Sequence, residues 1–128
     1  MDRPILVDTD VLVDYLRGDD RAAAFVKKCA ERMVLSSVVV AELYAGVKGE
    51  DELAALDEFV ALFRVVTVTV EIARAGGLLK RDFGKSHGVG MADAILAATA
   101  QAEGADLATL NVRHYPMFKG LKAAYDKR

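Results

Sequence analysis

The chain has 128 residues, of which 53% are hydrophobic and 28% are charged. This length and composition predict one compact domain, residues 1–128, with a core of its own. Seventeen Lys and Arg side chains against nineteen Asp and Glu side chains give a net charge of -2, which argues against a strongly basic nucleic-acid-binding body. The single cysteine, Cys29, excludes an intramolecular disulfide and a multi-cysteine zinc site.

The same counts bear on where the protein works. A lone cysteine suits a reducing compartment, and no apolar run approaches the roughly 18 residues of a membrane-spanning helix. We therefore expect a cytoplasmic protein without a membrane association.

Charge is distributed unevenly along the chain. Residues 1–79 carry nine basic and fourteen acidic side chains, and residues 80–128 carry eight basic and five acidic ones. The net charges are therefore -5 and +3, which predicts a carboxylate site beside a rim that attracts phosphates. The basic candidates for this rim are Lys80, Arg81, Lys85, Arg113 and Lys119.

Short apolar runs alternate with segments of helical periodicity. The apolar runs predict buried strands at 4–7, 33–36, 65–68 and 106–109. Apolar spacing or a high alanine content predicts helices at 38–47, 51–63, 71–83 and 90–103, with a flexible connection at 84–90. This alternation predicts an α/β fold with three layers, in which helices cover both faces of a mostly parallel sheet.

Three acids and one amide lie where ligands bind in such sheets, beyond the carboxyl ends of the strands. Asp8 ends the first strand, and Asn111 follows the last one. Asp93 lies in the first turn of the alanine-rich helix, where the helix dipole by itself would favour a carboxylate. Glu42 is the only acid of an apolar helix that we expect to be buried nearly all round, so it should meet a cation or protrude into a cleft.

We expect this topology to bring Asp8, Glu42, Asp93 and Asn111 to one edge of the sheet. Three carboxylates without enough Lys or Arg would repel one another, and a hard divalent cation resolves that repulsion. Ligation by oxygen alone fits Mg²⁺ or Mn²⁺ and does not fit zinc. The three acids are therefore the predicted metal ligands, and Asn111 completes the predicted catalytic group.

Four short motifs stand in a specific order along the chain. They are VDTDVLVDYL (7–16), SS followed by AELYAG (36–46), ADAILAATA (92–100) and LATLN (107–111). In order, spacing and total length they resemble the motifs of PIN-domain ribonucleases of the VapC toxin type, and the resemblance covers essentially the whole chain.

This resemblance implies a single PIN-like domain with about five parallel strands. It also implies a metal-dependent endoribonuclease whose acids are Asp8, Glu42 and Asp93, and a homodimer held by a cognate antitoxin. Asp8 and Asp93 would hold Mg²⁺, Glu42 would position a water, and Thr109 and Asn111 would orient the ligands. Single-stranded or loop RNA is the expected substrate.

The chain departs from the family pattern at two positions. Asp10 stands where the family often has Asn, which adds a charge near the site. Asn111 stands where the family often has a fourth acid. A neutral side chain at this position would weaken binding of a second metal ion more than binding of the first, so we expect one-metal chemistry.

Two alternatives remain open at this point. Residues 5–11, ILVDTDV, also resemble the signature of haloacid-dehalogenase-like phosphohydrolases, in which Asp8 would be the nucleophile and Asp10 the general acid. That family needs a late pair of acids after a strand, and here Asp106 precedes the strand. The other alternative is a non-catalytic protein-binding module with the PIN fold, for which Asn111 is the main support.

The remaining chemically reactive residues have structural interpretations. We expect His87 and His114 to be surface or turn residues, and Cys29 to be a small core residue. Asp14, well inside the first helix, is expected to be structural. Apolar surface on the helices at 51–63 and 71–83 is compatible with a dimer.

Overall fold

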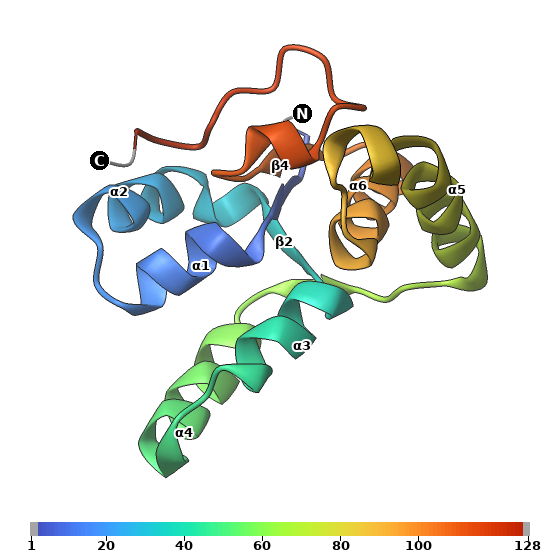
Figure 1. The fold of residues 1–128 in the computed structure, drawn as a ribbon. Coiled ribbons are helices and arrows are strands. Elements are labelled where there is room, and N and C mark those ends of the chain that lie inside the picture. Colours follow the sequence, from blue (N-terminus) through green and yellow to red (C-terminus); the bar gives the residue numbers. More distant parts are fainter. Residues whose placement is uncertain (1–2, 127–128) are drawn as a thin grey trace.

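The computed structural model describes residues 3–126, which form a parallel sheet with helices on both sides (Figure 1). The strands are β1 (Ile5–Val7), β2 (Met33–Ser36), β3 (Arg64–Val66) and β4 (Asp106–Ala108). The helices are α1 (Thr9–Leu16), α2 (Asp20–Cys29), α3 (Ser37–Ala45), α4 (Gly49–Val60), α5 (Val70–His87) and α6 (Met91–Glu103). Two 3₁₀ turns are η1 (Ala30–Arg32) and η2 (Val112–His114).

The sheet has the order β3-β2-β1-β4, and every neighbouring pair is parallel. β1 lies in its interior, with Ile5 opposite both Met33 and Asp106. All three residues of β1 are buried, as expected of an apolar strand covered on both faces. The parallel pairing brings the carboxyl ends of β1, β2 and β4 to one edge of the sheet.

Strands form at all four predicted apolar runs, but the third is not buried as predicted: β3 is an edge strand in which only Val66 is buried, and it ends before Thr67. The sheet has four strands within the described residues and not about five. The chain after η2 forms no strand within the described range. It makes one backbone hydrogen bond to the end of β4, from the Ala124 N–H to the Thr109 carbonyl at 3.0 Å. Pro116 and Gly120, which disfavour regular pairing, lie in this stretch. Figure 1 shows it crossing from the α6 side of the molecule to the α2 side.

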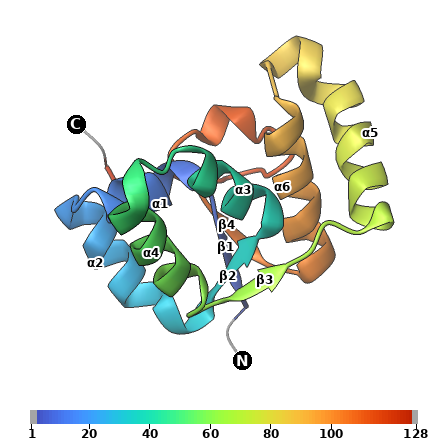
Figure 2. The ribbon, with the colours of Figure 1, turned by 90° about the horizontal axis from the view of Figure 1, so that it is seen from below.

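The helices divide between the two faces of the sheet. In both ribbon views α5 and α6 lie together on one side, whereas α1 and α2 lie on the other (Figures 1 and 2). Gly76 allows the close packing of α5 on α6, because a Cβ there would lie 3.0 Å from the Ile95 Cα. The α3 and α4 pair extends away from the sheet as a helical hairpin (Figure 1).

Two local expectations were wrong. The predicted connection at 84–90 is helical as far as His87, and α5 ends only at Gly88, whose φ of +64° suits glycine. Helix α3 is not buried nearly all round: Val39 and Leu43 are its buried residues, and Glu42 is exposed. The reason is that only the face with Val39 and Leu43, which lie one turn apart, is fully covered, and Glu42 lies off that face.

None of the helices in the described part of the chain is long and apolar enough to cross a bilayer.

Candidate functional site

Asp8 lies at the carboxyl end of β1, and its backbone extends the pairing with β4 through a bond from its N–H to the Ala108 carbonyl. Its side chain is 8% exposed and caps α1. Oδ1 accepts from the Thr9 N–H at 2.8 Å, and Oδ2 accepts from the Thr109 hydroxyl at 2.9 Å and from the Tyr115 hydroxyl at 2.8 Å. A carboxylate offers about four acceptor positions, so these bonds leave one position of Oδ1 for a further partner.

Asp93 lies in the first turn of α6 and faces the same hydroxyl. The Tyr115 oxygen is 3.2 Å from Asp93 Oδ1, and the His114 Nδ1 is 3.4 Å from Asp93 Oδ2. Asp8 and Asp93, which belong to different segments of the chain, therefore meet on the two sides of one tyrosine hydroxyl. The predicted convergence of these two acids is what the geometry shows.

Glu42 reaches the site from α3 through a single intermediary. Its Oε1 accepts a hydrogen bond of 2.6 Å from the Thr9 hydroxyl, and Thr9 directly follows Asp8. The side chain of Glu42 is otherwise exposed. Glu42 is therefore held at the margin of the site, beside Asp8 and Asp93, and no hydrogen bond joins it directly to either of them.

Asn111 occupies a more peripheral position. It is exposed and precedes η2, and its backbone N–H donates to the Thr109 hydroxyl at 3.1 Å. Within residues 3–126 no three acidic, histidine or cysteine side chains are close enough together to form a ready-made metal cluster. The fold thus brings Asp8 and Asp93 together, places Glu42 beside them and leaves the side chain of Asn111 in solvent.

Asp10 fastens the end of β4 to the start of α1. Its Oδ1 accepts from the Val11 N–H at 2.8 Å, and its Oδ2 accepts from the Leu110 N–H at 3.0 Å. Burial, and after it the negative charge of Asp8, raise the pKa of Asp10 from 3.8 to about 6. Burial also raises the pKa of Asp8, although three hydrogen bonds act in the opposite direction.

The acids of this edge lack basic partners. Among the described residues, no Lys or Arg nitrogen lies within 4.0 Å of Asp8, Asp10, Glu42 or Asp93. The groups that donate hydrogen bonds to Asp8 are neutral, and the basic side chain that pairs with Asp93 among residues 3–126 is that of His114. Carboxylates that have no basic partner and keep oxygen atoms free for ligation fit a hard divalent cation.

The amino-acid sequence matches the PIN domain family model over residues 5–117. The chain belongs to the PIN-domain family. It is 44% identical over 124 residues to Ribonuclease VapC19 of Mycobacterium tuberculosis, an alignment that covers 94% of this chain and 98% of the relative. It is therefore not a haloacid-dehalogenase-like phosphohydrolase.

Two solved structures have the same fold. A toxin-antitoxin complex from Klebsiella pneumoniae contains a chain with a TM-score of 0.84 and 22% identity, covering 96% of this chain and 99% of that one. FitAcB from Neisseria gonorrhoeae contains a chain with a TM-score of 0.71 and 28% identity, covering 87% of this chain and 90% of that one. The site described above is thus the acidic edge of a PIN domain.

The sequence analysis did not predict the contacts of three residues around this edge. Tyr115 joins Asp8 to Asp93, Thr9 holds Glu42, and His114 contacts Asp93, although it does lie in a turn as predicted. Tyr115 and His114 follow the last strand in an irregular stretch, where no periodicity shows which way a side chain points. Thr9 could have been recognised, because it lies between two acids at the end of a strand.

The predicted basic rim is only partly available. Lys80 is half-buried and donates to the Val89 carbonyl at 2.6 Å, and Arg81 pairs with Asp82 at 2.9 Å. The remaining candidates are exposed; they are Lys85, Arg113 and Lys119.

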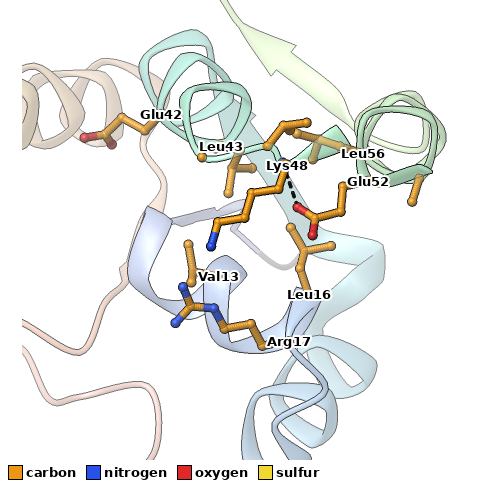
Figure 3. A pocket seen from close by; sticks show the side chains of 11 residues that line it. Val13, Leu16, Arg17, Glu42, Leu43, Lys48, Glu52 and Leu56 are labelled. Carbon is orange, nitrogen blue, oxygen red and sulfur yellow. Dashed lines mark hydrogen bonds between the residues drawn. The ribbon is translucent and has the colours of Figure 1, made fainter. Parts of the chain in front are cut away.

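A pocket of about 300 Å³ lies between α1, α3 and α4 (Figure 3). Its apolar lining comes from Val13, Leu16, Leu43 and Leu56, and its charged lining includes Arg17, Lys48, Glu52 and Glu42. Figure 3 shows Glu42 at the margin, with its carboxylate turned away from Lys48 and Glu52. The pocket therefore adjoins the acidic edge, and Glu42 belongs to both.

Proposed function

We propose that this PIN domain is a divalent-metal-dependent endoribonuclease and the toxin of a toxin–antitoxin pair. One observation carries the proposal: Asp8 and Asp93 converge at the carboxyl edge of the sheet, and neither has a Lys or Arg partner among the described residues. A relative that is 44% identical over almost the whole chain bears the name ribonuclease. This supports RNA as the substrate.

Each acid has a defined part in the proposed reaction. Asp8, through its open Oδ1 position, and Asp93 would hold Mg²⁺ or Mn²⁺. The bound ion supplies a lowered pKa for a coordinated water and stabilisation of negative charge on the phosphodiester oxygens. Glu42, whose Oε1 is held by Thr9, keeps Oε2 available to orient the attacking water and to accept its proton.

Two further residues support these acids. Thr109 is fully buried and donates to Asp8 Oδ2, so it fixes the orientation of that carboxylate. We assign Asn111 to the outer ligand positions, because its side chain is neutral and its backbone N–H donates to the Thr109 hydroxyl, which keeps the residue beside the site. With a neutral residue there, a single ion is the expected complement.

Unpaired RNA is the form of substrate that we propose for this edge. Lys85, Arg113 and Lys119 are exposed, and Arg113 directly precedes His114, which contacts Asp93. Single-stranded or looped RNA exposes its backbone to such a surface, whereas a regular helix does not bend into it. The exposed lysines and arginines would contact the phosphates on either side of the cleaved bond.

The test is cleavage of total cellular RNA by the purified chain, freed of any partner. Parallel reactions contain Mg²⁺, Mn²⁺ or EDTA, with Asp8→Ala as the matched variant. We expect discrete fragments that depend on the metal and are absent with Asp8→Ala. Intact RNA in every reaction would overturn the proposal and favour a non-catalytic binding module.

The pocket beside Glu42 is our candidate for the antitoxin site. The solved structure from Klebsiella pneumoniae that shares this fold is a toxin-antitoxin complex, and an apolar cleft edged by charges suits a short amphipathic segment. A segment in this pocket would lie against Glu42. Because Leu16 is 44% exposed, we expect Leu16→Asp to weaken capture of the co-expressed antitoxin without slowing RNA cleavage; equal capture would contradict the assignment.

A homodimer is the second proposed assembly. Exposed apolar side chains flank the edge strand β3: Leu62 is 75% exposed and Val70 is 81% exposed. Sedimentation of the wild type and of Val70→Asp tests this. We expect a dimer for the wild type and a shift toward monomer for the variant.

A further inference from the structure

Tyr115 occupies an unusual place, because its hydroxyl lies between two acids that we assign to metal binding. The oxygen is 2.8 Å from Asp8 Oδ2 and 3.2 Å from Asp93 Oδ1. The residue is 1% exposed, and it is the largest of the fully buried side chains. A tyrosine that served only to fill the core would not need its polar atom at this position.

We propose that Tyr115 is a positioning residue that holds Asp8 and Asp93 in the arrangement that binds the divalent ion. The inference rests on the proposed function, since it takes these two acids as the ligands. It adds a requirement that the acids alone do not imply, namely a neutral donor built into the site.

The hydroxyl can carry out this role because it is a donor without charge. Two carboxylates that share a small site repel each other, and an O–H between them reduces that repulsion without occupying the place of a cation. Its single proton is shared unequally, with the shorter contact to Asp8. Together with Thr109 it fills the acceptor positions of Asp8 Oδ2, so Oδ1 is the oxygen that remains open.

The ring is fixed well enough to impose this geometry. The Tyr115 N–H donates to the Val112 carbonyl at 3.0 Å, and the Tyr115 carbonyl accepts from the Phe118 N–H at 3.0 Å. The ring also lies 6.5 Å from the ring of Phe118, centroid to centroid. Because its backbone is bonded on both sides and its ring is buried, the hydroxyl cannot follow the carboxylates if they move apart.

The chain contains a matched control for the same chemical group. The Tyr125 hydroxyl donates to Asp14 Oδ2 at 2.7 Å, and Asp14 is 8% exposed, like Asp8. This second tyrosine–aspartate pair joins the C-terminal segment to α1 and includes none of the proposed ligands. Tyr115→Phe and Tyr125→Phe therefore remove the same atom from two tyrosine–aspartate pairs, of which one is buried within the site and the other is half-buried outside it.

The experiment measures Mn²⁺ binding by titration calorimetry on the metal-free wild type and both variants. Partners that orient metal ligands typically contribute 10- to 100-fold to affinity, so we expect Tyr115→Phe to raise the Kd for Mn²⁺ by at least about tenfold. Tyr125→Phe should leave the Kd unchanged. An unchanged or lower Kd for Tyr115→Phe, or an equal rise in both variants, would overturn the inference.

The dependence of the cleavage rate on Mn²⁺ concentration distinguishes positioning of the ligands from a purely structural role. If Tyr115 acts by positioning the ligands, Tyr115→Phe needs more Mn²⁺ for half-maximal RNA cleavage but approaches the wild-type kcat at saturating Mn²⁺. A kcat that stays low at saturating metal, with an unchanged metal requirement, would contradict this role.

Circular dichroism in EDTA shows whether Tyr115→Phe folds. If it does not fold, a measurement on the wild type tests the inference instead. With ¹³C-labelled tyrosine, Mg²⁺ should shift the ring resonances of Tyr115 in the wild type and leave those of Tyr125 in place. Equal responses of the two rings would overturn the inference.

Failure of the inference can be told apart from failure of the proposed function. If the wild type binds Mn²⁺ no better than Asp8→Ala does, the assignment of the metal site itself is wrong. If the wild type binds Mn²⁺, Asp8→Ala does not, and Tyr115→Phe equals the wild type, only the role of Tyr115 is lost.

Discussion

The two edges of the sheet treat negative charge in opposite ways. At the amino edge, Asp106 pairs with Arg3 at 3.3 Å and with Arg32 at 3.1 Å. At the carboxyl edge, Asp8 and Asp93 meet with no Lys or Arg within 4.0 Å among the described residues. The chain thus neutralises its acids at one edge and leaves them uncompensated at the other.

The acids at the two edges also differ in burial. The Asp106 side chain is 49% exposed, so water already stabilises its charge and its ion pairs contribute little. Asp8 is 8% exposed, and burial raises its pKa. A buried carboxylate that no basic side chain approaches is costly for the fold, and binding of the proposed cation would offset that cost.

The largest expected effect comes from removing an acid at the carboxyl edge. Asp93→Asn keeps the shape of the side chain but removes the charge that would hold the ion, whose contribution to the transition state is several kcal/mol. We expect the initial rate of RNA cleavage to fall by roughly 1,000-fold, with an unchanged circular dichroism spectrum. Asp106→Asn is the matched change at the other edge and should cleave at the wild-type rate; cleavage by Asp93→Asn at that rate would refute the site.

The next effect is on stability and follows from Asp10. Its pKa of about 6 in the fold lies above the ordinary 3.8, so the folded protein holds this proton more tightly than the unfolded chain. The free energy of unfolding should therefore fall as the pH rises from about 4 to about 6, and Asp10 accounts for up to about 3 kcal/mol of that fall.

Urea unfolding in EDTA at several pH values, on the wild type and on Asp10→Asn, measures this contribution. We expect a shallower pH dependence in the variant, with the slope that remains coming partly from Asp8. Identical slopes in the two proteins would mean that Asp10 does not titrate in this range.

A smaller effect concerns the tether between Thr9 and Glu42. Thr9→Val keeps the shape of the side chain and removes the hydroxyl that donates to Glu42 Oε1. One such bond has a net value near 1 kcal/mol, so kcat should fall by about fivefold. Thr9→Ser retains the hydroxyl and should restore most of the rate. If both variants behave alike, the hydroxyl does not hold Glu42 during the reaction.

The smallest effect is expected at the amino edge. Asp106→Asn removes the exposed ion pairs with Arg3 and Arg32, and we expect a loss of at most about 1 kcal/mol in the free energy of unfolding. High salt should reduce the difference from the wild type, because exposed charges are screened. A loss of several kcal/mol that persists in high salt would show that the two edges are not as different as their burial indicates.

Much of the fold could be predicted from local pattern. The apolar runs at 4–7 and 33–36 mark strands because a strand covered on both faces must be apolar throughout. The helix that carries Asp93 follows from its alanine content and its end at Gly104, where φ is +61°. The length of α5 could not be predicted, because Gly84 resembles a helix end until the packing of Lys80 beside it is known.

The sequence by itself indicated which acids lie at the carboxyl edge, since Asp8 follows a strand, Asp93 opens a helix and Glu42 is the only acid of an apolar helix, and parallel strands end at a common edge. Only the tertiary structure decided how they are held. Tyr115 reaches Asp8 from the far end of the chain, and Thr9 connects Glu42 to the same edge. Contacts of this kind depend on side-chain directions in irregular segments and on burial from all sides, and no local pattern of residues encodes either.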